Sequence, residues 1–241
     1  LLAVAAINFK ADQTLVGTAL NLLGTAGATV IVKAINTAAN PDDVSSIIQY
    51  AGAKKAFTVS IGSFEFSWFM LITALLLVAS YVLLYKTRFG LRLMACGEHP
   101  QAADSVGINV YKMRYAGVVI SGALGAIGGL AYIVPPVQTW NFEVGVAGAG
   151  FLALAVMIFG NWKPLNIAGA SLLFGLFKCI AASYASIDIN GDGVFMLAEI
   201  GISAHLYRML PYIVTLLVLA FTSKSSRAPK AEGIPYDKGQ R

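Results

Sequence analysis

The chain has 241 residues, of which 57% are hydrophobic and only 12% are charged, about half the charged fraction of a typical soluble domain. Its net charge is +5, from 17 Lys and Arg residues against 12 Asp and Glu residues. This composition excludes a disordered chain, a disulfide scaffold and an ordinary cytosolic enzyme. It predicts an all-α, polytopic integral membrane protein that lies in a lipid bilayer.

Near the start of the chain, two apolar segments are weak candidates for membrane spans. The first segment, residues 1–9, is short and would be the remnant of a span. Because the chain opens with Leu1 instead of Met, we expect that an N-terminal portion is missing. Residues 14–35 are rich in glycine, with Asn21 in the middle and Lys33 near the end. We expect this second segment to form a broken or re-entrant helix.

Five later segments are firm candidates, because each offers about 20 predominantly apolar residues, enough to cross the hydrocarbon core of a bilayer. In chain order they cover residues 66–85, 115–134, 144–162, 165–183 and 205–222. We therefore expect a transmembrane domain over residues 1–222, followed by a basic tail over residues 223–241.

The charges of the connecting segments predict their orientation, because cytoplasmic loops carry an excess of Lys and Arg. The 86–114 loop holds five basic residues, and the 223–241 tail holds five more. The expected outer loops, 38–65, 135–143 and 185–204, together hold seven acidic residues. The 86–114 loop and the tail are thus expected in the cytoplasm. The positive net charge is then a topology signal and predicts no nucleic acid partner.

None of the 12 acidic residues falls within an expected span. An ion-coupled carrier usually keeps an ionisable residue at membrane depth to bind its coupling ion. The sequence therefore disfavours a stand-alone ion-coupled carrier or channel, and it leaves a purely structural membrane subunit open. An intramembrane enzyme is disfavoured too, because the only two histidines, His99 and His205, fall on opposite sides of the membrane.

The 86–114 loop contains a predicted short helix over residues 100–106. Pro100 stands in its first turn and Gly107 is its stop. A short helix between two spans, with small side chains on it, suits docking into a groove of a partner protein. A plain surface helix would show the same pattern, so this segment alone leaves both readings open.

Several motifs resemble a known family and occur in that family's order. The segment GLRLMACGEHPQAADSVGIN at 90–109, followed by SGALGAIGG at 121–129, resembles the coupling segment and next helix of importer-type ABC transporter permeases. That class moves branched-chain amino acids, simple sugars and nucleosides. The segment GFLALAVMIFGNWKP at 150–164 and the tail RAPKAEGIPY at 227–236 resemble its nucleoside-type members, which carry guanosine or purines. Residues 13–23 resemble the family's segment before the long outer loop.

The resemblance implies a permease subunit, not an enzyme, of an ATP-driven importer for a nucleoside in a prokaryotic cytoplasmic membrane. Simple sugars and branched-chain amino acids are the alternative substrates. The implied partners are an ATP-binding subunit, a second, related permease and an extracytoplasmic substrate-binding protein. ATP and Mg²⁺ would bind to the first partner, because this chain has no Gly-x-x-x-x-Gly-Lys-Ser/Thr loop, and no cofactor is expected here.

The match also implies which residues have which role. The contact with the ATP-binding subunit would be formed by Gly97, Glu98, Ala102, Ala103, Gly107 and Ile108. As working hypotheses for the substrate path we take Asn21, Ser121 and Phe151. Asn21 is equally suited to bonding a neighbouring helix, and Ser121 belongs to a small-residue pattern that favours tight helix packing.

A second motif lies in the expected outer loop 185–204. Its residues 188–199 fit the calcium-binding loop of an EF-hand, which places oxygen ligands at fixed positions and glycine at position 6. EF-hands usually work in pairs, and an Asp- and Gly-rich turn gives the same residues without a metal, so calcium stays an open alternative. The candidate ligands are Asp188, Asn190, Asp192, Val194 through its carbonyl, and Glu199.

Overall fold

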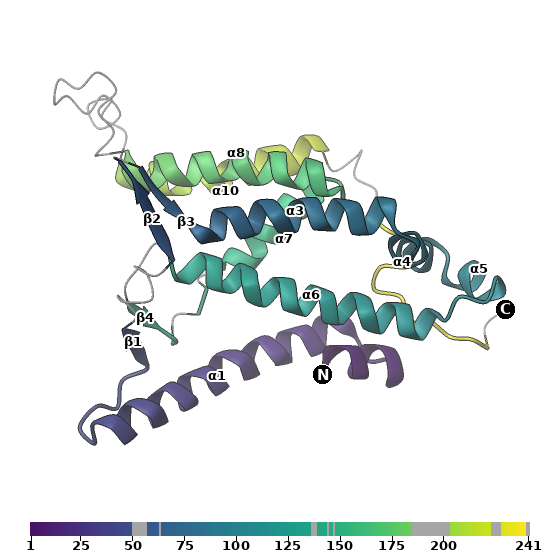
Figure 1. The fold of residues 1–241 in the computed structure, drawn as a ribbon, viewed down its shortest axis with the longest axis horizontal. Helices are drawn as coiled ribbons and strands as arrows, with labels where there is room; N and C mark the ends of the chain where they lie inside the picture. The colour runs from purple at the N-terminus through teal and green to yellow at the C-terminus, as the bar shows by residue number, and fades with distance from the viewer. Residues whose placement is uncertain are drawn as a thin grey trace. The chain divides into compact units, whose positions relative to one another are not determined.

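A computed structural model describes residues 1–49, 57–62, 64–135, 139–143, 145–146, 148–184, 203–222 and 228–239. The chain separates into two units. Unit 1 consists of Leu1–Gly148 together with Pro229–Arg241, and unit 2 consists of Ala149–Ala228. Both units are built mainly from helices, which confirms the all-α membrane fold that the composition predicts (Figure 1).

Unit 1 contains six helical segments and four short strands among its described residues. The helical segments are η1 (Val4–Asn8), α1 (Gln13–Ala39), α3 (Trp68–Lys86), α4 (Arg88–Glu98), α5 (Pro100–Ser105) and α6 (Val110–Ile133). The strands are β1 (Ile47–Gln49), β2 (Thr58–Ile61), β3 (Phe64–Ser67) and β4 (Thr139–Asn141).

The helix α1 corrects the expectation of a broken or re-entrant segment over residues 14–35. It is one continuous helix of 27 residues. The Asp12 carboxylate caps its start by accepting hydrogen bonds from the N–H groups of Thr14 and Leu15 at 2.8 and 3.0 Å. Threonine hydroxyls further along donate to carbonyls four residues earlier, as Thr25 does to Asn21. Polar side chains satisfied within the helix do not interrupt it.

Four of the described helices are long and apolar enough to cross a membrane: α1, α3, α6 and α8 (Pro164–Ser183). The prediction of five firm spans is therefore slightly wrong. Within the described part of the predicted span 144–162, the structure has the 11-residue helix α7 (Ala149–Phe159). A helix of that length rises about 17 Å, which is well short of a bilayer core. The predicted span 205–222 coincides with α10 (Ala204–Thr222).

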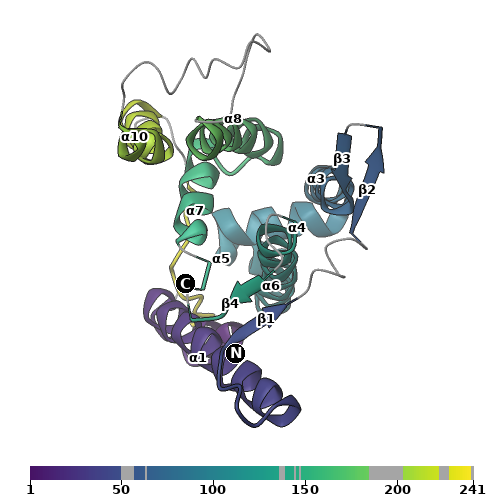
Figure 2. The same cartoon turned by 90° about the vertical axis from the view of Figure 1, so that its left-hand side faces the viewer.

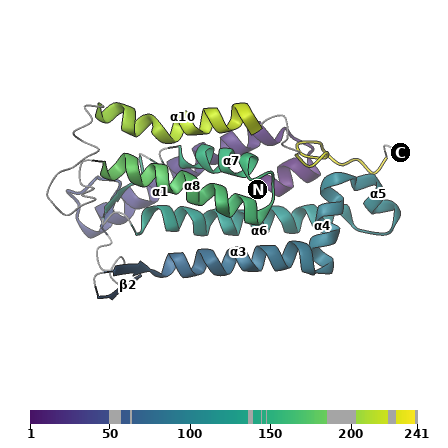
Figure 3. The ribbon, with the colours of Figure 1, turned by 90° about the horizontal axis from the view of Figure 1, so that it is seen from above.

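The two ends of α3 and α6 carry different structures, as Figures 1 and 3 both show. Helices α4 and α5 lie at one end, which we call the α4–α5 end. The strands lie at the opposite end of α3 and α6, which we call the strand end.

The strand end brings together two segments that the sequence predicts on one side of the membrane. Strand β1 pairs antiparallel with β4, with Ile48 opposite Trp140. The Ser46 hydroxyl donates to Asn141 Oδ1 at 2.8 Å, and Lys33 pairs with Glu143 at 2.9 Å. Strands β2 and β3 form a separate hairpin. The sequence predicts no strands here, because three- and four-residue strands give almost no alternating pattern.

Unit 2 is a small helical assembly of α7, α8 and α10, in which α8 contacts both of the others (Figure 2). Its core is formed by Val156 of α7 with Ala170 and Phe174 of α8. The turn between α7 and α8 places Asn161 and Trp162 in the left-handed region, with φ of 52° and 56°.

Candidate functional site

The turn from α3 into α4 is fixed by a single threonine. The Thr87 hydroxyl donates to the carbonyl of Leu83 at 2.6 Å and accepts from the N–H of Gly90 at 3.1 Å. The hydroxyl therefore closes the end of one helix and caps the start of the next. Gly90 lies directly against the main chain of Leu83 and Leu84. Helix α4 is thus held closely against the end of α3.

The predicted short helix over residues 100–106 is α5, Pro100–Ser105, with Pro100 at its first position. Gly107 follows with φ +83°, a conformation that favours glycine, and its N–H donates to the Asp104 carbonyl at 2.9 Å. Asn109 then caps α6 by accepting from the Lys112 N–H at 3.0 Å. The predicted helix and its glycine stop are both confirmed within one residue.

The residues implied to contact an ATP-binding subunit divide into two groups. Glu98, Ala102 and Gly107 are exposed at the α4–α5 end. Ala103 is buried, whereas Gly97 and Ile108 are half-buried. The sequence analysis did not single out Val106, which directly follows α5 and is 74% exposed. The available signal was a lone apolar residue between Ser105 and Gly107.

A buried cluster beneath α5 also escaped sequence reasoning. It joins Cys96 of α4, Ala103 of α5, Val110 of α6 and Tyr236 of the C-terminal segment. The Tyr236 ring lies 5.3 Å from the Tyr111 ring in an edge-to-face arrangement. Burial raises the pKa of the Cys96 thiol above its ordinary value. The signal for this cluster was the only aromatic residue in a basic tail.

The same segment forms an ion pair with the start of the chain. Asp237 accepts a hydrogen bond from the Lys10 ammonium at 2.8 Å. This contact lowers the pKa of the Asp237 carboxyl and raises the pKa of Lys10. Both side chains are partly exposed, so the pair orients the segment more than it stabilises it.

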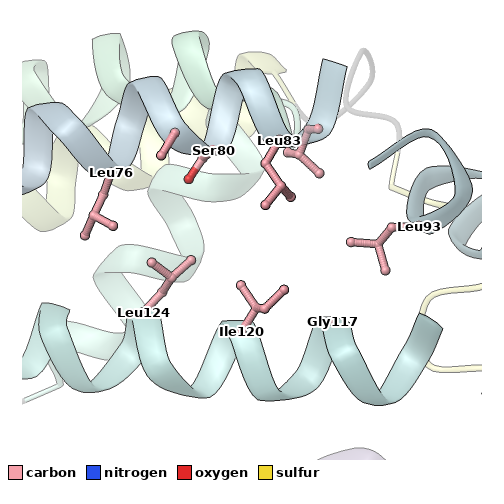
Figure 4. A pocket seen from close by; sticks show the side chains of 9 residues that line it. Leu76, Ser80, Leu83, Leu93, Gly117, Ile120 and Leu124 are labelled. Atoms are coloured by element: carbon pink, nitrogen blue, oxygen red, sulfur yellow. The ribbon is translucent and has the colours of Figure 1, made fainter. Parts of the chain in front are cut away.

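An apolar cavity of about 250 Å³ lies between α3, α4 and α6 (Figure 4). Leu76 and Leu83 of α3 face Leu124 and Ile120 of α6 across it, and Leu93 of α4 points in from the α4–α5 end. Ser80 supplies the single polar side chain of the lining. Because a nucleoside needs several hydrogen-bond partners, this lining suits an apolar group better than such a substrate.

The remaining candidate residues are spread over the chain. Asn21 on α1 and Ser121 on α6 both have exposed side chains in unit 1. Phe151 lies on α7 in unit 2 and is 81% exposed. The candidate calcium loop at 188–199 lies outside the described residues.

The chain matches known permeases over nearly its whole length. Residues 1–219 match the family described as the permease component of the branched-chain amino acid transport system. The chain is 38% identical to the guanosine ABC transporter permease protein NupQ of Bacillus subtilis, over 99% of this chain and 73% of that protein. It is also 38% identical to the nucleoside ABC transporter permease protein NupC of Lactococcus lactis, with the same coverage.

A second permease of the same Lactococcus strain, the nucleoside ABC transporter permease protein NupB, is 26% identical over 68% of this chain and 44% of that protein. No solved structure gives a significant match. Permease components are transport subunits and not enzymes, which confirms the prediction from the sequence. The chain is a multi-pass membrane protein and belongs to the family of branched-chain amino acid transport system permease components.

Proposed function

We propose that this chain is the permease subunit of an ATP-driven importer that carries a nucleoside across a prokaryotic cytoplasmic membrane. The observation that carries the proposal is the 38% identity to guanosine and nucleoside permeases over 99% of the chain. The helices α1, α3, α6 and α8 contain no Asp or Glu, which supports a solute without a positively charged group. A zwitterionic amino acid would need a counter-charge for its ammonium group.

The α4–α5 end faces the cytoplasm in this proposal, and α5 docks on the ATP-binding subunit. The five basic residues of the 86–114 loop support that orientation. Val106, Ala102 and Glu98 form the exposed surface for the contact. Such a surface combines an apolar anchor with a charged rim, as docking surfaces commonly do.

Transport then proceeds by alternating access. ATP and Mg²⁺ bind to the partner subunits, whose closure moves α5. Because Thr87 and Gly90 hold α4 tightly against the end of α3, the displacement reaches a spanning helix directly. An extracytoplasmic binding protein delivers the nucleoside to the strand end, and a related second permease completes the path.

The test is a co-purification from native membranes followed by an uptake assay. The tagged parent protein is solubilised gently, and the proteins that accompany it are identified. A parallel sample carries Glu98→Arg at the α4–α5 end. The matched control carries Glu65→Arg, which makes the same charge reversal at an exposed position of β3 on the strand end.

An ATP-binding subunit should accompany the unaltered chain and the Glu65→Arg control, and its yield should fall with Glu98→Arg. Membranes that contain the complex should take up labelled guanosine, and excess unlabelled nucleoside should compete. Absence of any ATP-binding subunit from the unaltered complex would overturn the importer assignment. Competition by glucose or leucine, but not by nucleosides, would overturn only the substrate class.

A further inference from the structure

The C-terminal segment 229–237, which we call the C-terminal strap, is bound to the α4–α5 end at several points. The N–H of Ala231 donates a hydrogen bond to the carbonyl of Gly97 at 2.9 Å. Gly97 lies in the last turn of α4, three residues before α5 begins. A main-chain bond at this position holds the strap against the junction of the two helices.

Tyr236 is the deepest contact of the strap, with only 5% of its surface exposed. It belongs to one buried cluster with Cys96 of α4, Ala103 of α5 and Val110 of α6. The strap therefore shares a hydrophobic core with three consecutive helices. The aromatic ring of Tyr236 supplies a large buried area in a region whose other members are small.

The strap is also anchored beyond this cluster. Arg114, one turn into α6, donates from Nη1 to the carbonyl of Ile234 at 2.9 Å, and its guanidinium carbon lies 6.0 Å from the centre of the Tyr236 ring. At the far end of the strap, Asp237 pairs with Lys10 between η1 and α1. The strap thus links α4, α5, α6 and the start of the chain.

We propose that Tyr236 and the C-terminal strap are the positioning element of the importer: they lock α5 to α6, so that movement of α5 by the ATP-binding subunit is transmitted to a spanning helix. This inference rests on the proposed function. Residues 99–109, which join α4 to α6, are mostly exposed, and Gly107 permits bending. Without the strap, α5 would move with α4 and α3 while α6 stayed in place, and less nucleoside would be moved per ATP hydrolysed.

The experiment uses the complete transporter with its ATP-binding subunit in proteoliposomes, and it measures nucleoside moved per ATP hydrolysed. The main variant is Tyr236→Ala, with Tyr236→Phe as the conservative version that keeps the ring. A second variant, Ala231→Pro, removes the N–H that bonds Gly97 and leaves the ring in place. The matched control is Ile234→Ala, because the Ile234 side chain is exposed and only its carbonyl contacts Arg114.

Release of the strap is followed separately through Cys96. The chain has two cysteines, so Cys179→Ser leaves the buried Cys96 as the single thiol. Cys96 is 2% exposed and lies in the same buried cluster as Tyr236, so a maleimide should label it slowly in the unaltered chain. Tyr236→Ala should raise the labelling rate at least tenfold, whereas Ile234→Ala should leave it unchanged.

Tyr236→Ala and Ala231→Pro should still bind the ATP-binding subunit and hydrolyse ATP, but transport per ATP should fall at least fivefold. Tyr236→Phe and Ile234→Ala should keep the normal ratio. A merely structural role would lower assembly and hydrolysis together and leave the ratio of transport to hydrolysis unchanged. That result in either variant would overturn the proposal.

The proposal would also be overturned by a variant in which Cys96 is labelled rapidly but the ratio of transport to ATP hydrolysis is unchanged. Failure of the proposed function can be distinguished from failure of this inference. In the former case, no ATP-binding subunit would co-purify even with the unaltered chain.

Discussion

Gly90, in the first turn of α4, lies so close to the carbonyl oxygen of Leu83 in the last turn of α3 that a Cβ at position 90 would overlap with it. The obstacle is main chain, which cannot rotate away as a side chain can. Gly90→Ala should therefore lower the free energy of unfolding by about 1–3 kcal/mol, as overpacking typically does. Thermal unfolding of the purified permease in detergent measures this loss.

The matched control is Gly97→Ala in the same helix. A Cβ at position 97 would meet only the Cβ of Pro229 at 3.8 Å, an ordinary contact. This variant should unfold at the temperature of the unaltered chain or slightly above it, because alanine favours the helix. Equal stability of the two variants would show that α4 is not packed against α3 as described.

Unit 2 offers an independent prediction at the turn between α7 and α8. A Cβ on Gly160 would lie 2.6 Å from the main-chain nitrogen of Ile167. Gly160→Ala should therefore force the two helices apart and lower the melting temperature of the chain. Gly175→Ala, in open space on α8, is the control that should leave it unchanged. A melting temperature unaffected by Gly160→Ala would contradict the close approach of α7 and α8.

The exposed Val106 gives a prediction about assembly that rests on the proposed function. Val106→Asp should reduce the yield of co-purified ATP-binding subunit about tenfold, because a carboxylate without a partner is costly to bury in an apolar contact. The control is Val44→Asp, since Val44 is 69% exposed in the segment between α1 and β1. Equal loss in both variants would mean that α5 is not the docking surface.

The sequence predicts the parts of the fold that depend on local chemistry. The helix Pro100–Ser105 and its Gly107 stop could be read directly, because proline at a helix start and glycine at its end act within one turn. The apolar helices α3, α6 and α8 likewise follow from length and composition. The continuity of α1 could not be predicted, because satisfaction of its polar residues by neighbouring carbonyls leaves little trace in hydropathy.

Contacts between distant segments were the part that escaped prediction. Tyr236 lies more than 120 residues from Val110, and no local pattern says that a tail tyrosine packs against a loop helix. The pairing of β1 with β4 is equally remote. The division of the implied coupling residues into exposed and buried groups also required the structure, because small residues such as Ala102 and Ala103 look alike in the sequence.

The ion pair of Lys33 and Glu143 at the strand end gives a prediction about pH. The Lys33 ammonium, with help from Ser46, lowers the pKa of the Glu143 carboxyl below its ordinary value. The contribution of the ion pair to the stability of the fold is therefore fully present above the ordinary carboxyl pKa of about 4.3. This contribution is lost as the pH falls through the lower pKa that Glu143 has in the folded state. Glu143→Gln lacks this contribution at every pH.

The difference in melting temperature between the unaltered chain and Glu143→Gln should therefore be constant from about pH 5 to 8 and shrink below about pH 4. The control is the charge swap Lys33→Glu with Glu143→Lys, which should restore the contact at neutral pH. High salt should reduce the difference, because both side chains are about half exposed. A difference that peaked near pH 3 would contradict the sign of the pKa shift, and with it the assignment of Lys33 as the partner of Glu143.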